Sequence, residues 1–161
     1  MKKLILVRHA KSSWKHNVID HERPLNNRGK NDAEIVSNHL KKSNLEIHKV
    51  LSSDAVRAKT TANAFILNLN IDKNLMNLNH NLYDFSGQNI IKTIKEVDAS
   101  INTLMVFGHN HAITAFVNTY GSKYIENVPT CGVTIIDFNI DKWADLKKGK
   151  TIYTVFPKDL K

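Results

Sequence analysis

The segment Leu4-Ile5-Leu6-Val7-Arg8-His9 is the most informative about architecture. Four consecutive apolar residues that stop at two basic residues are typical of a central strand buried on both faces. Three later segments, residues 50–53, 103–107 and 133–138, are rich in β-branched, aromatic or other apolar residues and also predict strands. Residues 151–156 predict a last strand.

The segments between these strands repeat apolar residues with a helical period. Ala33, Val36 and Leu40, for example, follow each other at i, i+3 and i+7. The other predicted apolar faces are Ala55, Ala58, Ala62, Phe65 and Leu69; Ile90, Ile94 and Val97; and Ile113, Phe116 or Val117, and Tyr120. Asn27, Asp54 and Ser86 stand where N-caps are expected. Alternating strands and helices predict an α/β fold, a three-layer α/β/α sandwich with a mostly parallel central sheet.

The composition indicates a packed globular chain. Its 161 residues are 42% hydrophobic and 24% charged, with 6 Gly and 3 Pro, so we expect residues 1–161 to form one domain. The single Cys131 excludes an internal disulfide and a zinc site made of several thiolates. No run approaches the ~20 apolar residues of a membrane span. These features predict a cytoplasmic protein without a membrane partner.

The net charge of +8 comes from 23 Lys and Arg against 15 Asp and Glu. Such a field attracts anions, whether phosphorylated metabolites, acidic protein surfaces or nucleic acid. A nucleic-acid-binding module would rest on this charge alone, because the chain has no basic helix motif or binding-fold signature. We therefore expect no nucleic-acid partner.

Polar residues at the ends of predicted strands point to a common site. Arg8 and His9 follow the first strand, Arg57 lies in the first turn of the helix after the second, and His109 follows the strand at 103–107. Open parallel sheets bind ligands beyond the carboxyl ends of their strands. If these strands are neighbours, two guanidinium groups and two imidazoles converge there, and such a cluster requires an anion.

Phosphoryl transfer is the chemistry that fits this cluster. Negative charge spreads over three oxygens of a phosphoryl group in transfer, and planar guanidinium groups such as those of Arg8 and Arg57 match that geometry. A neutral imidazole can attack phosphorus and form a phosphohistidine that water later hydrolyses. Either His9 or His109 could be the nucleophile on these grounds.

Four ordered motifs resemble the histidine phosphatase superfamily, and most closely its small bacterial phosphohistidine phosphatase branch. They are Leu6-Val7-Arg8-His9-Ala10-Lys11-Ser12, Arg23-Pro24-Leu25-x-x-Arg28-Gly29, Ser52-Ser53-x-x-x-Arg57-Ala58-x-x-Thr61 and Gly108-His109-Asn110. The resemblance implies a phosphoglycerate mutase-like fold and a phosphatase that needs neither metal nor cofactor. It also implies that His9 is the nucleophile and that Arg8, Arg57 and His109 bind the phosphate.

The chain departs from the family pattern at two places. Ala10 stands where the superfamily usually has Gly, and sugar-phosphate members place a Glu general acid where this chain offers only Asp84. An alkoxide leaving group needs a proton, whereas the phosphorus–nitrogen bond of phosphohistidine is labile without one. The sequence therefore favours phosphohistidine in a partner protein, of the histidine phosphotransfer type, with a small phosphate ester as the alternative substrate.

Two residues, Arg23 and Asp84, can each be interpreted in two ways. Arg23 either lines the pocket or pins its loop to the start of a helix, and Asp84 is either a substrate-binding acid or, as we favour, a helix cap. A metal set would draw on the loop and strand-end residues His16, His21 and His111, with Asp20 and Glu22, but these lack paired ligand spacing, so we expect no metal. We also expect Trp14 and Trp143 to be packing residues and Cys131 to be unreactive.

Overall fold

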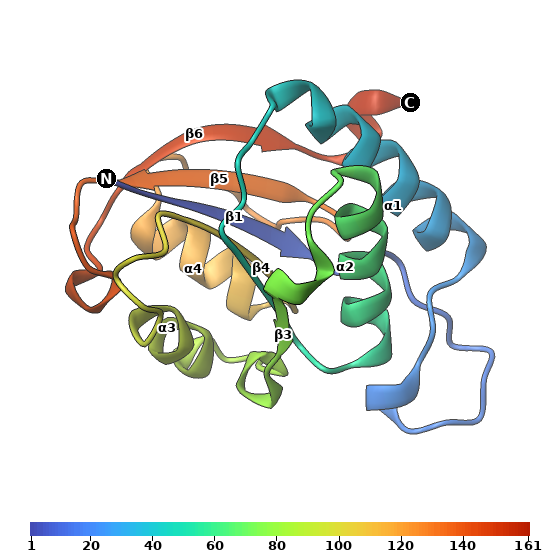
Figure 1. Ribbon diagram of the computed structural model, residues 1–161. Helices are drawn as coiled ribbons and strands as arrows, with labels where there is room; N and C mark the ends of the chain where they lie inside the picture. Colours follow the sequence, from blue (N-terminus) through green and yellow to red (C-terminus); the bar gives the residue numbers. More distant parts are fainter.

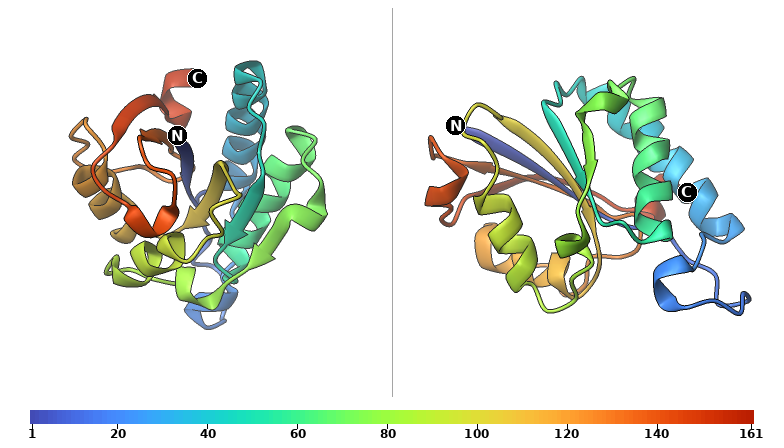
Figure 2. Two further views of the ribbon diagram at one scale, coloured as in Figure 1. Left: turned by 60° about the vertical axis from the view of Figure 1, so that its left-hand side comes forward. Right: turned by 60° about the horizontal axis from the view of Figure 1, so that its bottom comes forward.

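A six-stranded sheet lies between two pairs of helices (Figures 1 and 2) in the computed structural model, which describes residues 1–161. The strands are β1 (Lys2–Arg8), β2 (Lys49–Ser52), β3 (Met76–Leu78), β4 (Thr103–Gly108), β5 (Val133–Phe138) and β6 (Lys150–Val155). Their order is β3-β2-β4-β1-β5-β6; β5 is antiparallel to both of its neighbours, β1 and β6, and the other five strands run in one direction. This arrangement confirms the predicted mostly parallel sheet.

The central position of β1 explains its run of apolar residues. It pairs with β4 on one side, where Leu6 is opposite Val106, and with β5 on the other. Successive side chains of a strand point to opposite faces. Leu4 and Leu6 accordingly pack in the cluster below one face, and Ile5 and Val7 in the cluster on the other. Each fully buried side chain of this kind contributes about 1.5–3 kcal/mol to stability.

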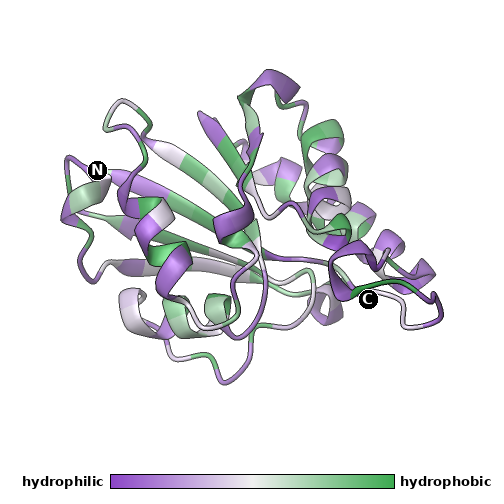
Figure 3. Ribbon diagram, turned by 90° about the horizontal axis from the view of Figure 1, so that it is seen from below, coloured by the Kyte–Doolittle hydropathy of each residue, from purple (hydrophilic) through white to green (hydrophobic).

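The four helices cover both faces of the sheet as the apolar periods predict. They are α1 (Asn27–Leu40), α2 (Val56–Asn68), α3 (Gln88–Lys95) and α4 (Ala112–Tyr120). Helices α1 and α2 bury one side against the face that carries Ile5, and α3 and α4 against the face that carries Leu6. Figure 3 shows the resulting mixture of hydrophobic and hydrophilic residues on the helices. No helix is long and apolar enough to cross a membrane.

Details at the element ends differ from the sequence prediction. The N-cap of α1 is Asn26, whose side chain accepts a hydrogen bond from the Gly29 N–H at 2.8 Å, and not Asn27. The N-caps of α2 and α3 are Ala55 and Gly87, each one residue after the predicted caps Asp54 and Ser86. Strand β3 was not predicted, because three residues at the sheet edge carry too little apolar pattern.

The fold brings three chain segments to one edge of the sheet. Strands β1, β2 and β4 are neighbours and run parallel, so the residues that follow them meet. Residues 9–26 leave β1 as a loop that projects beyond this edge, and Figure 1 shows it below α1 and α2. The beginning of this loop packs directly against Gly29 of α1. A side chain at this position would not fit, because a Cβ there would lie 2.0 Å from the carbonyl oxygen of Lys11.

Candidate active site

The structure brings together the four residues predicted to converge. Arg8 ends β1, His9 follows it, and Arg57 lies in the first turn of α2; all three line a cavity of about 240 Å³. His109, just after β4, is buried and does not line the cavity itself, but its ring centroid lies 5.1 Å from that of His9. The other residues lining the cavity are Lys11, Ser12, Trp14, Asp20, Arg23, Phe85, Asn110 and Thr130.

His9 is oriented by a hydrogen bond to the backbone. Its Nδ1–H donates to the carbonyl oxygen of Ala10 at 2.7 Å, which leaves Nε2 as the unprotonated nitrogen of the neutral ring. Burial lowers the pKa of His9 to about 3, and the positive charges of Arg57 and Arg8 act in the same direction. The Nε2 lone pair is therefore available at neutral pH.

Arg8 and Arg57 each have a buried guanidinium donor without a partner. Arg57 is 2% exposed and donates to the carbonyl oxygen of Asp20 at 2.7 Å, and Arg8 donates to that of Val128 at 2.8 Å. The Nε atoms of both arginines are buried and make no hydrogen bond. Burial also lowers the pKa of Arg8. An unsatisfied buried donor costs about 1–3 kcal/mol, so such groups are typical of a site that binds an anion.

The ring of His109 is held in place by Ser53. The Ser53 hydroxyl lies 2.8 Å from Nε2 of His109 and accepts a hydrogen bond from the Ala55 N–H at 3.2 Å. Its own hydrogen can therefore be donated to Nε2, which favours the tautomer with a proton on Nδ1. That Nδ1 is buried without a partner. Burial, together with the charges of His9 and Arg57, lowers the pKa of His109 to about 2, so its ring is also neutral.

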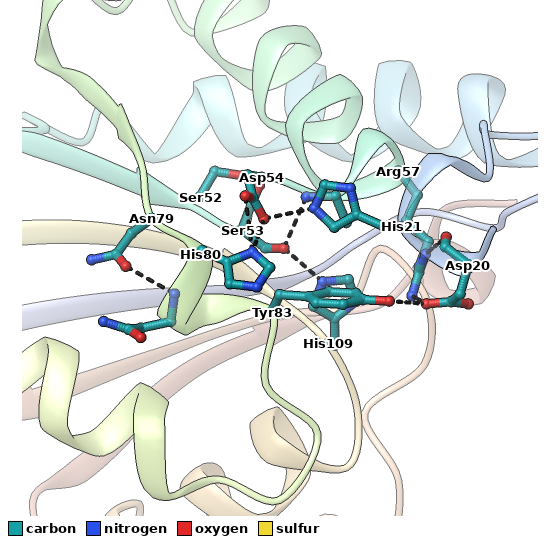
Figure 4. Close-up of polar contacts among 12 residues, drawn as sticks. Asp20, His21, Ser52, Ser53, Asp54, Arg57, Asn79, His80, Tyr83 and His109 are labelled. Carbon is teal, nitrogen blue, oxygen red and sulfur yellow. Dashed lines mark hydrogen bonds and ion pairs between the residues drawn. The ribbon is translucent and has the colours of Figure 1, made fainter.

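Asp20 is a cavity residue that the sequence analysis considered only as a metal ligand. Its carboxylate accepts hydrogen bonds from Arg57 at 2.9 Å and from the Tyr83 hydroxyl at 2.5 Å (Figure 4), and also from Arg23 at 3.0 Å. Burial acts to raise the pKa of Asp20, but these hydrogen bonds hold it well below its usual range. In the sequence, the one feature that could have indicated a role for Asp20 in the cavity is its position three residues before Arg23, with which it forms an ion pair.

Arg23 lies where one of its two interpretations predicted, in the cavity, and its other contacts are within its own loop and not with the start of a helix. It lines the cavity, and its guanidinium also donates to the Ser12 hydroxyl at 2.7 Å, which ties the loop together. Trp14 stacks on this guanidinium at 3.5 Å but is 76% exposed. Trp14 thus packs on Arg23 alone and not in the core, because its loop projects from the sheet and offers little else to cover the ring. Trp143 is fully buried, as expected.

Asp84 caps a helix outside the cavity. Its carboxylate accepts backbone N–H hydrogen bonds at 3.0–3.2 Å from four residues at the start of α3: Ser86, Gly87, Asn89 and Ile90. The cavity is reached by its neighbour Phe85 instead. The structure thus supports the capping interpretation and not substrate binding by Asp84.

The remaining histidines and the cysteine are placed elsewhere. His21 lies beside Asp54 and His80, and not with His16 and His111 as the metal set considered above would need. Cys131 is buried in the core beside α1, and burial raises the pKa of its thiol. The cavity itself carries four cationic side chains and one carboxylate, and so fits an anion: Arg8, Lys11, Arg23, Arg57 and Asp20.

Sequence comparison identifies matches over most of the chain. The sequence model of the histidine phosphatase superfamily (branch 1) matches residues 4–96. An uncharacterized protein of Mycobacterium tuberculosis is 28% identical over 153 residues, covering 89% of this chain and 93% of that protein. An uncharacterized chloroplastic protein of Arabidopsis thaliana is 28% identical over 157 residues, covering 89% of this chain and 70% of its own length.

Solved structures confirm the predicted fold. A SixA protein of Agrobacterium tumefaciens superposes with a TM-score of 0.81 at 23% identity, covering 97% of this chain and 98% of its own. The protein histidine phosphatase SixA complexed with tungstate gives 0.80 at 19% identity, with 99% of both chains covered. Phosphoglycerate mutase of Bacillus anthracis gives 0.64 at 16% identity, over 97% of this chain and 92% of that one. The architecture is therefore phosphoglycerate mutase-like.

Proposed function

Because the chain belongs to the histidine phosphatase superfamily, we propose that it hydrolyses phosphohistidine in a partner protein through a phosphorylated His9. The observation that carries this proposal is the setting of His9. Its Nδ1–H is bound to the backbone, its ring is neutral, and it lines a cavity whose buried arginine donors lack partners. A nucleophile and the groups that neutralise a phosphoryl anion thus meet at one place.

The proposed reaction has two displacements at phosphorus. In the first, Nε2 of His9 forms a bond to phosphorus while the phosphorus–nitrogen bond of the substrate breaks. The substrate imidazole, protonated on its other nitrogen, leaves as a neutral ring. In the second, water attacks phosphorus, the bond to His9 breaks, and phosphate and a proton are released. Arg8, Arg57 and the Nδ1–H of His109 supply hydrogen bonds to the phosphoryl oxygens.

The lack of a proton donor favours phosphohistidine over an alkyl ester. Asp20 is the carboxylate in the cavity, and it is kept ionised by Arg57, Arg23 and Tyr83. Asp84 accepts hydrogen bonds from backbone N–H groups and lies outside the cavity. An alkoxide would leave unprotonated from such a site, whereas a neutral imidazole needs no acid.

A second hollow beside the cavity supports a protein substrate. It has a volume of about 630 Å³ and shares Lys11, Ser12 and Trp14 with the cavity. Lys15, Lys30 and Arg28 add further positive charge to its lining. A small ester would fill the 240 Å³ cavity without reaching this hollow, whereas an acidic protein surface around a phosphohistidine would contact it.

The test compares three substrate classes at one pH: a phosphorylated histidine phosphotransfer protein, free phosphohistidine, and a panel of alkyl and aryl phosphates. We expect the largest kcat/KM for the phosphoprotein. Lys30→Glu should raise KM for the phosphoprotein only, and Lys148→Glu serves as the control for charge, because Lys148 is exposed and lines neither hollow. A higher kcat/KM for alkyl phosphates would replace the proposal with a small-molecule phosphomonoesterase.

A further inference from the structure

His21, Asp54 and His80 form a second cluster at the rim of the site, outside the cavity. Nε2 of His21 lies 2.8 Å from Oδ1 of Asp54, and Nδ1 of His80 lies 3.0 Å from both carboxylate oxygens. The three groups each offer one ligand atom within 4.8 Å of the others. Figure 4 shows the two imidazoles facing the carboxylate from different sides.

The cluster is assembled from three separate parts of the chain. His21 belongs to the loop after β1, Asp54 to the turn between β2 and α2, and His80 to the single helical turn His80–Leu82 after β3. Tyr83 packs against both imidazoles, with ring centroid distances of 4.9 Å to His21 and 5.6 Å to His80. The rings are therefore held in place by contacts beyond their hydrogen bonds to Asp54.

Two imidazoles and a carboxylate are a common ligand set for a transition metal. In a tetrahedral zinc site the ligand atoms lie ~2.0–2.2 Å from the metal, which puts neighbouring ligand atoms about 3.3 Å apart. The two contacts to the Asp54 carboxylate are 2.8–3.0 Å, and the two imidazole nitrogens lie within 4.8 Å of each other. The ion would therefore need the carboxylate contacts to lengthen by a few tenths of an ångström and the imidazoles to approach each other by at most about 1.5 Å. Imidazole donors favour zinc, cobalt, nickel or copper over magnesium and calcium.

We propose that His21, Asp54 and His80 bind one divalent transition-metal ion, with water in the remaining coordination position. The ion would replace the protons now shared between the imidazoles and the carboxylate, and would join the three segments that form this side of the active-site wall. Asp54 is adjacent in sequence to Ser53, which holds His109, and His21 is adjacent to Asp20, which contacts Arg57. The ion is not part of the proposed phosphoryl transfer, so the two proposals stand independently.

Binding is tested on the full chain after treatment with EDTA. Titration with Co²⁺ should give visible absorption typical of a four- or five-coordinate ion, saturate at one equivalent and be reversed by Zn²⁺. Calorimetry with Zn²⁺ should give the same stoichiometry. Asp54→Asn and His80→Asn should each weaken Zn²⁺ binding at least tenfold. His16→Asn is the matched control, because His16 lines the separate basic hollow, and it should bind as the wild type does.

Thermal unfolding separates loss of the site from loss of the fold. His80 is an exposed residue, its side chain 71% accessible, so His80→Asn should leave the Tm without metal unchanged. Zn²⁺ should raise the Tm of the wild type and of His16→Asn, and leave that of His80→Asn unaltered. Absence of binding by the wild type at 1 mM Zn²⁺, or one-equivalent binding retained by both cluster variants, would overturn the proposal and leave the cluster a hydrogen-bonded group only.

Discussion

Two pairs of histidines lie at the same edge of the sheet and differ in the charge around them. The rings of His9 and His109 are 5.1 Å apart, and those of His21 and His80 are 5.8 Å apart. The first pair is buried beside arginines, whereas the second flanks the Asp54 carboxylate. Similar ring geometry thus occurs in two opposite electrostatic settings.

This difference shows that the charge of the neighbouring groups determines whether an imidazole is suited to bind an anion or a cation. Positive neighbours and burial keep His9 and His109 neutral, which suits a nucleophile and a hydrogen-bond donor to an anion. A carboxylate neighbour and access to water suit His21 and His80 to a cation. Substitutions in one pair should therefore leave the function of the other intact.

The largest expected effect is that of His9→Ala. Without the proposed nucleophile, turnover should fall to the background of the assay, and rapid quenching of the wild type should trap an acid-labile, alkali-stable phosphate on His9. His80→Ala is the matched control from the other pair, and its activity in the presence of EDTA should be close to wild type. Phosphate trapped on His109 instead would reverse the assignment of the nucleophile.

Arg57→Ala should have the next largest effect. Removal of a preorganised donor to the developing charge typically costs ~10²–10³ in rate, so kcat/KM should fall by about that factor. Lys59→Ala, two residues further along α2 and partly exposed, controls for loss of positive charge and should change kcat/KM little. Activity near the wild-type level in a folded Arg57→Ala protein would remove Arg57 from the site.

The sheet and the meeting point of the cationic residues could be predicted because both follow from local patterns. The apolar run of β1 and the helical periods of α1 to α4 can each be recognised from residues that are close together in the sequence. Parallel strands then require Arg8, Arg57 and His109 to lie at one edge. The reversed direction of β5 is not contained in its composition, and β3 is too short to leave a pattern.

The contacts made by the loops could not be predicted. Asp20 reaches Arg57 across 37 positions of sequence, and Tyr83 reaches Asp20 across 63. The path of residues 9–26 depends on such distant contacts, and no spacing rule encodes them. The same holds for His21, Asp54 and His80, which come from three loops and show no metal-ligand spacing in the sequence.

Asp20 contacts the arginines of the first pair's setting and should have a moderate effect. Its carboxylate competes with a phosphoryl group for Arg57 and Arg23. Asp20→Asn should therefore bind inorganic phosphate or tungstate about two- to fivefold more tightly, the range expected of a partly exposed ion pair. Competitive inhibition constants measure this change, with Asp98→Asn, an exposed carboxylate elsewhere, as control. Weaker anion binding would show instead that Asp20 orients Arg57 for the substrate.

Asp84→Asn should change stability and not catalysis. The lost interaction is a cap of α3, so the free energy of unfolding should fall by about 1 kcal/mol, measured by urea denaturation. The kcat/KM values for alkyl and aryl phosphates should fall by the same small factor or not at all. A defect confined to alkyl phosphates would identify Asp84 as a general acid, and a large equal loss on all substrates would assign it to hydrolysis of phosphorylated His9.

The smallest expected effect is the absence of titration at His9. With its pKa lowered to about 3, the ring should keep the same NMR chemical shifts between pH 5 and pH 8 in a buffer free of phosphate. Linkage gives the sign of the effect on stability. The unfolded chain binds a proton at His9 near pH 6.5 and the folded chain does not, so stability should decrease as the pH falls from about 6.5 towards 3. His9→Asn should flatten this decrease, since it removes one of the two rings that must be protonated on unfolding. A His9 signal that titrates near pH 6.5 would mean that burial and the charges of Arg57 and Arg8 do not keep the ring neutral, and the contrast between the two histidine pairs would then be lost.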